Sequence, residues 1–115
     1  MNLLEKLLPK FGNHKLILAN SVKAYLDAFP EQRQAMFTSL KSQDRDAFGQ
    51  AAHRIKGSVG FFAGPDLTAK CQELETLSSQ APFEELASSL ERTDKELQAF
   101  KNELVELLAE LGEVS

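Results

Sequence analysis

The sequence lacks several features that would place it in a familiar class. Its single cysteine, Cys71, cannot form an internal disulfide, which favours a cytoplasmic location. No apolar run is long enough to span a bilayer, so we expect no membrane contact. The first ten residues include an acid and are interrupted by Pro9, which argues against a signal peptide. Only His14 and His53 accompany Cys71 as typical zinc ligands, and we expect no metal.

The charges are unevenly distributed along the chain. Residues 1–65 hold nine Lys and Arg against five Asp and Glu, whereas residues 66–115 hold four against twelve. A modestly basic first half suits an acidic partner better than nucleic acid, which usually needs more positive charge. The alternative is that solvated helices merely differ in charge. A length of 115 residues is enough for one domain, which we expect to span residues 1–115.

Apolar residues recur at helical spacing along nearly the whole chain, and no strand alternation, repeat or low-complexity tract is present. This pattern predicts an all-α fold, an antiparallel four-helix bundle with a short extra N-terminal helix. The predicted helices are Leu3–Leu8, a long helix through Leu18–Leu40, one from Asp44 to about Phe62, one bearing Leu67–Leu77, and a long one from Pro82 through Leu111. The leading helix is expected to cap the bundle or, alternatively, to form a partner or dimer surface.

Some helix boundaries carry their own signals. The apolar stripe of the second helix keeps its phase across Pro30, which favours one kinked helix over a fresh start at Pro30. Asp44 and Asp66 are predicted to cap the third and fourth helices. Pro82 is expected near the first turn of the last helix.

The stretch from Gly49 to Gly60 reads G-Q-A-A-H-R-I-K-G-S-V-G and places His53 among glycines. On a helix, Gly49, Gly57 and Gly60 share the face of His53, although each glycine costs roughly 1 kcal/mol relative to alanine. The apolar stripe of this helix lies about 140° away from His53, so the histidine should face solvent. We interpret the glycines as clearance for something large that must reach the imidazole.

A solvent-facing imidazole can act as a nucleophile or phosphate carrier, because its neutral form has a free nitrogen lone pair. Lys56 would disfavour the imidazolium and could neutralise a phosphoryl group, and Gln50 and Ser58 could donate hydrogen bonds. An ordinary surface histidine is the alternative, which the glycines and Lys56 argue against. A catalytic triad would need a carboxylate on His53, and within the helix only Asp46 is near.

The residues after this helix allow two interpretations. Phe61 should be partly exposed if the helix reaches it. It is then either a docking contact two turns from His53 or a side chain that turns into the core beneath the Gly64–Pro65 turn. Cys71 falls on an apolar stripe and is expected to be a small buried filler.

The stretch A-A-H-R-I-K-G-S-V-G-F-F-A-G-P-D-L, followed by C-Q-E-L-E, resembles the histidine-containing phosphotransfer (HPt) domain of bacterial two-component phosphorelays. The family pattern maps onto the residues Ala52, His53, Ile55, Lys56, Gly57, Ser58, Leu67, Leu74 and Glu75. The sequence has Ala63 then Gly64 where the family usually has glycine then alanine, so the chain could leave the histidine helix differently.

The resemblance implies a phosphorelay carrier rather than an enzyme. His53 would accept a phosphoryl group at its Nε2 atom from a receiver-domain aspartyl phosphate, and a second receiver would then take it. Lys56, Gln50 and Ser58 would stabilise the phosphate; residues Gly49, Arg54, Gly57, Gly60 and Phe61 would allow access and docking. The resemblance also implies a cytoplasmic monomer that binds receiver domains but no nucleic acid, with Mg²⁺ on the receiver and no cofactor of its own. The alternative is a helical module that binds a receiver or regulator without phosphotransfer.

Overall fold

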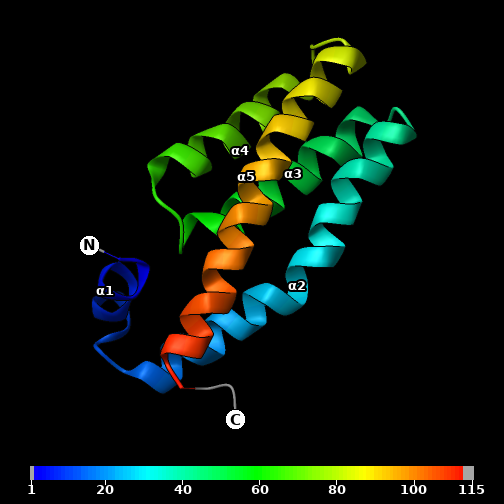
Figure 1. Cartoon of the computed structure of the whole chain (residues 1–115). Coiled ribbons are helices and arrows are strands. Elements are labelled where there is room, and N and C mark those ends of the chain that lie inside the picture. The colour runs from blue at the N-terminus through cyan, green and yellow to red at the C-terminus, as the bar shows by residue number, and fades with distance from the viewer. Residues whose placement is uncertain (1, 113–115) are drawn as a thin grey trace.

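The computed structural model of the protein describes residues 2–112, and every regular element in that range is a helix. It contains α1 (Leu3–Leu7), a 3-10 helix η1 (Leu8–Phe11), α2 (Lys15–Lys41), α3 (Arg45–Gly60), α4 (Pro65–Leu77) and α5 (Phe83–Glu110). Figure 1 shows their order along the chain. The predicted all-α class is confirmed.

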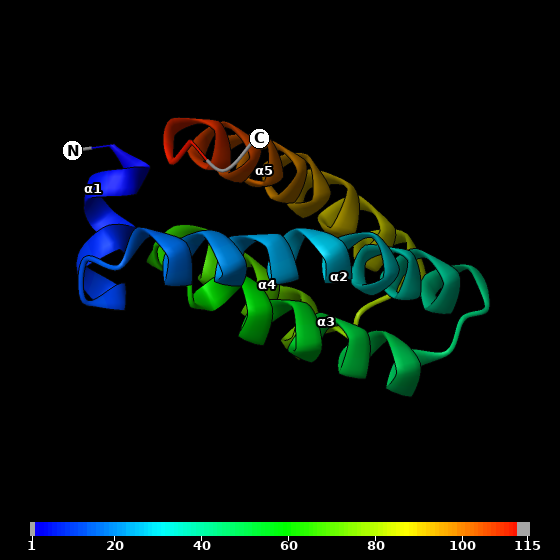
Figure 2. The same cartoon turned by 90° about the horizontal axis from the view of Figure 1, so that it is seen from below.

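Helices α2 to α5 surround one core. Helix α2 packs against α3 and α5, and α4 packs against both α3 and α5. Successive helices alternate in direction, and α1 with η1 lies at the end where α2 begins and α5 ends (Figures 1 and 2). The 27 residues of α2 and 28 of α5 each span about 40 Å at 1.5 Å per residue, which accounts for the longest dimension of 44 Å.

Helix α2 is continuous through Pro30, as the unbroken phase of its apolar stripe predicts. Its ribbon changes direction near the middle (Figure 1). Pro30 has no backbone N–H to donate to Leu26, and its ring crowds that carbonyl, which is the usual cause of a kink. Farther along, Arg33 joins α2 to α5 through two hydrogen bonds of 2.7 and 2.8 Å from its guanidinium to the Asp94 carboxylate.

Several helix ends differ from the predicted ones. Asp44 caps α3 as expected, since its Oδ1 accepts a 3.0 Å hydrogen bond from the amide of Ala47. The cap of α4 is Gly64 and not Asp66, which lies in the first turn, where a negative charge is favourable. Helix α3 ends at Gly60 rather than near Phe62. Pro82 is the N-cap of α5 and so lies next to its first turn, as predicted.

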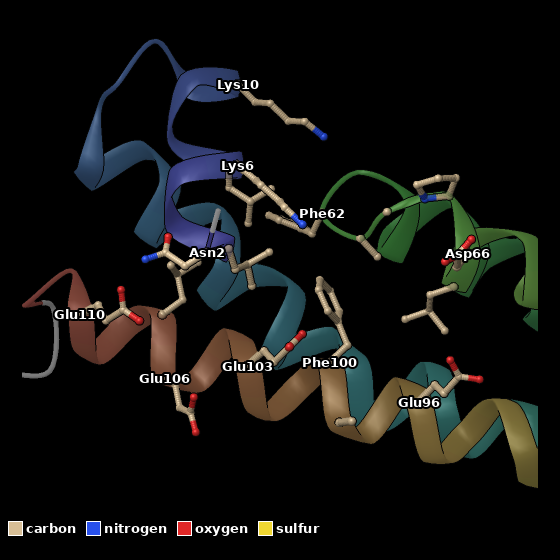
Figure 3. A pocket seen from close by; sticks show the side chains of 18 residues that line it. Asn2, Lys6, Lys10, Phe62, Asp66, Glu96, Phe100, Glu103, Glu106 and Glu110 are labelled. Carbon is tan, nitrogen blue, oxygen red and sulfur yellow. The ribbon is translucent and has the colours of Figure 1, made fainter.

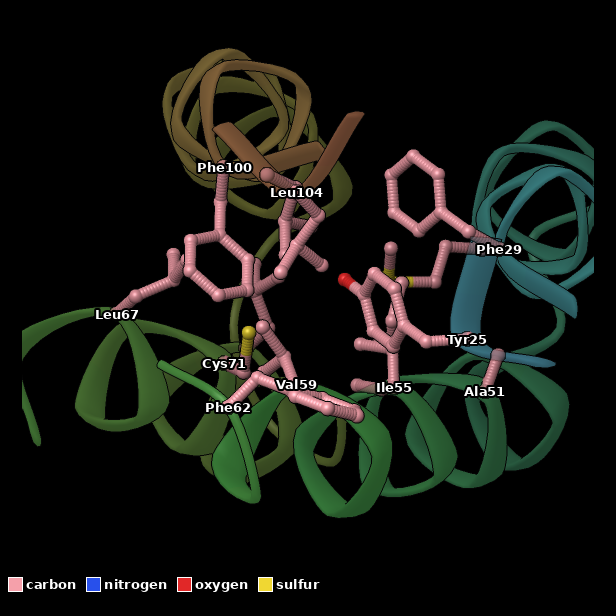
Figure 4. Close-up of a cluster of buried hydrophobic side chains, with 14 of the residues drawn as sticks. Tyr25, Phe29, Ala51, Ile55, Val59, Phe62, Leu67, Cys71, Phe100 and Leu104 are labelled. Carbon is pink, nitrogen blue, oxygen red and sulfur yellow. The ribbon is translucent and has the colours of Figure 1, made fainter. Parts of the chain in front are cut away.

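The apolar stripes identified in the sequence meet in the core (Figure 4). The stripe of α3 is fully buried, and Cys71 is buried and unpaired as expected. The leading helix contributes Leu7 to this core, with Leu3 and Leu4 partly buried against it, so it does cover an end of the bundle. The buried core residues of α3 are Phe48, Ala51, Ala52, Ile55 and Val59.

Tyr25 places a hydroxyl in the middle of this apolar core, pointing between the helices in Figure 4. The group is buried, and its oxygen has no hydrogen-bond partner among the described residues. Burial raises the pKa of the Tyr25 hydroxyl well above its usual range, and Cys71 adds to the effect. The group is therefore desolvated without compensation.

We expect Tyr25→Phe to raise the free energy of unfolding by about 1 kcal/mol, because it removes an unsatisfied polar atom and keeps the ring. Urea denaturation followed by circular dichroism measures the change. Tyr25→Leu is the control and should be destabilising, because it also loses the ring contacts with Phe29 and Phe62. A destabilising Tyr25→Phe would show that the hydroxyl is satisfied in solution.

Candidate functional site

His53 lies on the solvent-facing side of α3, opposite the buried stripe of that helix. Its side chain is 66% exposed, whereas Ala52 and Ile55 beside it are fully buried. The helical phase of the sequence therefore placed His53 correctly. An exposed imidazole on a rigid helix is accessible to a second protein.

A carboxylate from the neighbouring helix holds the His53 ring. The Nδ1 atom of His53 lies 3.0 Å from Oε2 of Glu75 on α4. An ionised carboxylate only accepts hydrogen bonds, so Nδ1 must carry the proton. In the neutral ring this leaves the lone pair on Nε2, which is the nitrogen free to react.

Lys56 completes a charged group with Glu75. Its ammonium lies 3.0 Å from Glu75 Oε1 and donates a 2.7 Å hydrogen bond to Oε1 of Gln72. The hydrogen bond from Lys56, with a smaller contribution from His53, holds the pKa of Glu75 below its ordinary value of 4.5. The carboxylate is therefore ionised at neutral pH. Lys56 and His53 therefore contact the two oxygens of the same Glu75 carboxylate.

An open groove of about 630 Å³ runs beside His53 between α3 and the end of α4. Gln50 and Arg54, both exposed, line it together with His53 and Glu75. Arg45 also lines the groove, but its guanidinium is occupied by the Ser78 and Ala81 carbonyls at 3.2 and 2.7 Å. Gln50 and Arg54 are therefore the groove residues best placed for an incoming partner.

The three glycines near His53 have different surroundings. A Cβ on Gly57 would contact nothing within 4 Å, so this position is open to solvent beside the histidine. A Cβ on Gly49 would lie 2.8 Å from the Ser78 hydroxyl oxygen, and one on Gly60 3.5 Å from Thr68. Gly49 thus allows the close approach of α3 to α4, a packing reason that the sequence did not reveal. Of the three glycines, only Gly57 is best explained as leaving space for a partner to reach His53.

Ser58 and Phe61 lie farther from the imidazole. The Ser58 hydroxyl donates to the Arg54 carbonyl at 3.2 Å and accepts from Gln32 Nε2 at 3.0 Å, so it is engaged toward α2. A phosphate role for Ser58 would require it to leave these partners. Phe61 is 54% exposed and touches Phe11 and Phe62 edge-on, so it does not turn into the core.

The sequence reasoning did not mention Gln72, and it named Glu75 as part of the family pattern without giving it a role at His53. Within the histidine helix it found only Asp46 as a nearby acid, and it did not consider acids of other helices. The signal was present: Cys71 and Leu74 mark the buried face of α4, so Gln72 and Glu75 share one flank of it. Periodicity could not show that this flank faces His53, because that depends on how α3 and α4 pack.

Comparisons with known proteins identify the family of the chain. A family model described as the Hpt domain matches residues 21–113. In structure, the chain is similar to the crystal structure of the HPT domain from the Hpt sensor hybrid histidine kinase from Shewanella, with a TM-score of 0.77, 21% identity and 92% of each chain covered. At that identity the structural likeness shows the fold alone. A search of curated proteins found no match.

The protein belongs to the Hpt domain family, because the family model covers most of its length. Hpt domains carry phosphoryl groups on histidine in two-component phosphorelays, and they are carriers rather than conventional enzymes. They interact with receiver domains in these relays. None of the helices within residues 2–112 combines the length and apolar character needed to cross a bilayer.

Proposed function

We propose that this protein is a phosphorelay carrier whose phosphorylated atom is Nε2 of His53. The observation that carries the proposal is the hydrogen bond from His53 Nδ1 to Glu75, which leaves Nε2 unprotonated on an exposed ring. The proposal also takes residues 1–115 as one domain, a monomeric antiparallel four-helix bundle of α2 to α5 preceded by α1. It acts in the cytoplasm and binds no nucleic acid.

Phosphoryl transfer then follows from the charges around the ring. The Nε2 lone pair forms a P–N bond as the bond between phosphorus and the receiver's aspartate oxygen breaks, and the aspartate leaves as a carboxylate. The imidazole becomes positively charged while Nδ1 keeps its proton. Glu75 faces that proton and would stabilise the positive ring as it forms. Gln50, which lines the groove beside His53, and Lys56, released from Glu75 and Gln72, would then bind the phosphoryl oxygens.

The partner in this proposal is a receiver domain that supplies both the aspartate and Mg²⁺, with no cofactor on this chain. Its acidic pocket would meet Arg54 and Lys56 and would close over the open surface at Gly57. The exposed ring of Phe61, two turns along the same helix edge, adds an apolar contact. Transfer from this carrier to a second receiver reverses the same step.

Mixing the protein with a phosphorylated receiver tests the proposal directly. The expected result is a label on His53 that is labile in acid and stable in base, as phosphohistidine is, with the aspartyl phosphate consumed in equal amount. Peptide mapping distinguishes His53 from His14. Tight binding without any label on His53 would instead support the interaction module.

Glu75→Leu should slow transfer to His53 by about tenfold or more, because it removes both the group that fixes the tautomer and the counter-charge for the phosphorylated ring. The rate is measured in single-turnover mixing with a phosphorylated receiver. The nitrogen NMR shifts of His53 should change from a ring protonated at Nδ1 to a tautomer mixture. An unchanged circular dichroism spectrum and melting temperature would show that the slower transfer does not result from loss of the fold.

The lowered pKa of Glu75 predicts how the stability of the protein and its transfer rate depend on pH. Because the pKa of Glu75 is lowered in the folded protein, its contribution to stability is present above its ordinary pKa near 4.5 and is lost as the pH falls through the folded-state value. The rate of transfer by the parent protein should therefore show no titration of Glu75 between pH 6 and 8.

Glu73→Leu is the matched control for Glu75→Leu, because Glu73 lies on the same helix and is exposed, and this variant should transfer at the parent rate. Equal slowing of both variants would contradict the positioning role.

A further inference from the structure

A second hollow lies away from His53, between α1, the start of α4 and the outer face of α5. This cleft has a volume of about 790 Å³, larger than the groove beside the histidine. Figure 3 shows the N-terminal elements on one side of it, α5 on the other, and Phe62 and Phe100 between them. His53 and Glu75 do not line it, so it is separate from the phosphotransfer site.

The apolar residues at the floor of the cleft keep slightly more of their surface exposed than most of the core does. Phe62, Leu67 and Phe100 line it and retain 8%, 9% and 6% of their surface, and they are three of the four most exposed members of that core. Apart from Ala81 and Tyr25, the other buried apolar residues keep 2% of their surface or less. An apolar partner side chain that entered this cleft would therefore remove core surface from water.

The α5 wall of the cleft is acidic. Glu103, Glu106 and Glu110 are exposed along this wall, and none of them makes an ion pair with another residue in the 2–112 range. Glu96 also lines the cleft but is paired with Lys70. On the opposite wall, Lys6 and Lys10 come from α1 and η1. The cleft thus combines an apolar floor with one wall of three carboxylates that form no ion pair within residues 2–112.

We propose that this cleft docks an amphipathic, cationic segment of a partner protein. Bulky apolar side chains of the segment would cover Phe62 and Phe100, and its Lys or Arg side chains would face Glu103 and Glu106. Lys6 and Lys10 set the orientation, because they repel the cationic side of the segment from the α1 wall. This site would allow a partner to bind while His53 remains open to a receiver.

A second copy of the chain fits this surface poorly. A second copy carries the same formal net charge of -4, so the α5 carboxylates of the cleft would meet another acidic molecule. Like charges in that arrangement oppose association. The charge of the wall therefore favours a cationic partner over a second acidic chain.

A fluorescent amphipathic peptide with lysines on one face and leucine and phenylalanine on the other is the probe, and anisotropy measures its affinity for the full chain. Glu103→Lys/Glu106→Lys should weaken binding by about tenfold or more. The matched control is Glu73→Lys/Glu91→Lys, which makes the same change in net charge at exposed sites outside the cleft. Ala99→Trp, at an exposed cleft position, should obstruct binding without removing any charge.

Binding that survives Ala99→Trp, or that falls equally in both double variants, would overturn the proposal, because the peptide would then respond only to overall charge. Absence of saturable binding to the parent protein would also overturn it. So would self-association of the parent that Ala99→Trp abolishes, since a second copy would then occupy the cleft. Labelling of His53 by a receiver should be the same in all these variants, so the outcome is independent of the phosphotransfer proposal.

Discussion

Replacing His53 with glutamine should abolish phosphoryl transfer from a phosphorylated receiver, with no detectable acid-labile, base-stable label on the chain. Glutamine is polar and of similar size but has no ring nitrogen with a free lone pair. His53 is largely exposed, and surface substitutions usually change stability by less than about 0.5 kcal/mol. The loss of label should therefore occur in a folded protein, as circular dichroism and thermal unfolding can verify.

His14→Gln is the matched control for this experiment. His14 is the other histidine of the chain and is also exposed, at the start of α2, where its side chain makes no capping hydrogen bond. We expect this variant to accept the phosphoryl group at the parent rate. A label that persists in His53→Gln and disappears in His14→Gln would place the phosphorylated residue elsewhere and refute the proposed role of His53.

Gly57→Leu should slow transfer by about 10²-fold while making the helix more stable. The leucine would stand one turn from His53 on the open face of α3, where it would hold the receiver's aspartate away from Nε2. Misplacement of reacting groups by about 1 Å can have an effect of that size. Replacing a helical glycine with leucine should at the same time add up to roughly 1 kcal/mol of stability, because a Cβ at this position meets nothing within 4 Å.

Gly57→Ala distinguishes obstruction from changes in helix rigidity. Alanine gives the same or greater gain in helix stability, but it adds a single methyl group. Its transfer rate should remain within a few-fold of the parent rate in single-turnover mixing with a phosphorylated receiver. If alanine and leucine slow transfer equally, the glycine matters for backbone flexibility and not for access.

These predictions rest on two levels of inference. The spacing of apolar residues along α3 was enough to place His53 on the solvent side and Phe48, Ile55 and Val59 in the core. The same reasoning predicted the continuity of α2 through Pro30. Local periodicity succeeds here because each long helix buries one face, and the buried face leaves its period in the sequence.

The spacing of apolar residues within one helix could not predict the contacts between helices. The sequence indicated access as the reason for Gly49, whereas the structure shows a close approach to Ser78. Asp66 was expected to cap α4, but the chain turns two residues earlier, at Gly64. Ser58 was assigned to the phosphate, yet its hydroxyl bonds to Gln32 of α2. Each difference involves a contact between segments that are far apart in the sequence or a turn that positions them.

The sequence by itself determined the helical class, the buried faces and the exposure of His53, because these follow from the 3.6-residue period of single helices. The resemblance implied reaction at Nε2, and only the tertiary structure supplied a physical reason for proposing that choice of nitrogen. That choice depends on Glu75, 22 residues away in the chain, reaching Nδ1 across the contact between α3 and α4. The packing of two helices sets that distance, and no local pattern in either helix encodes it.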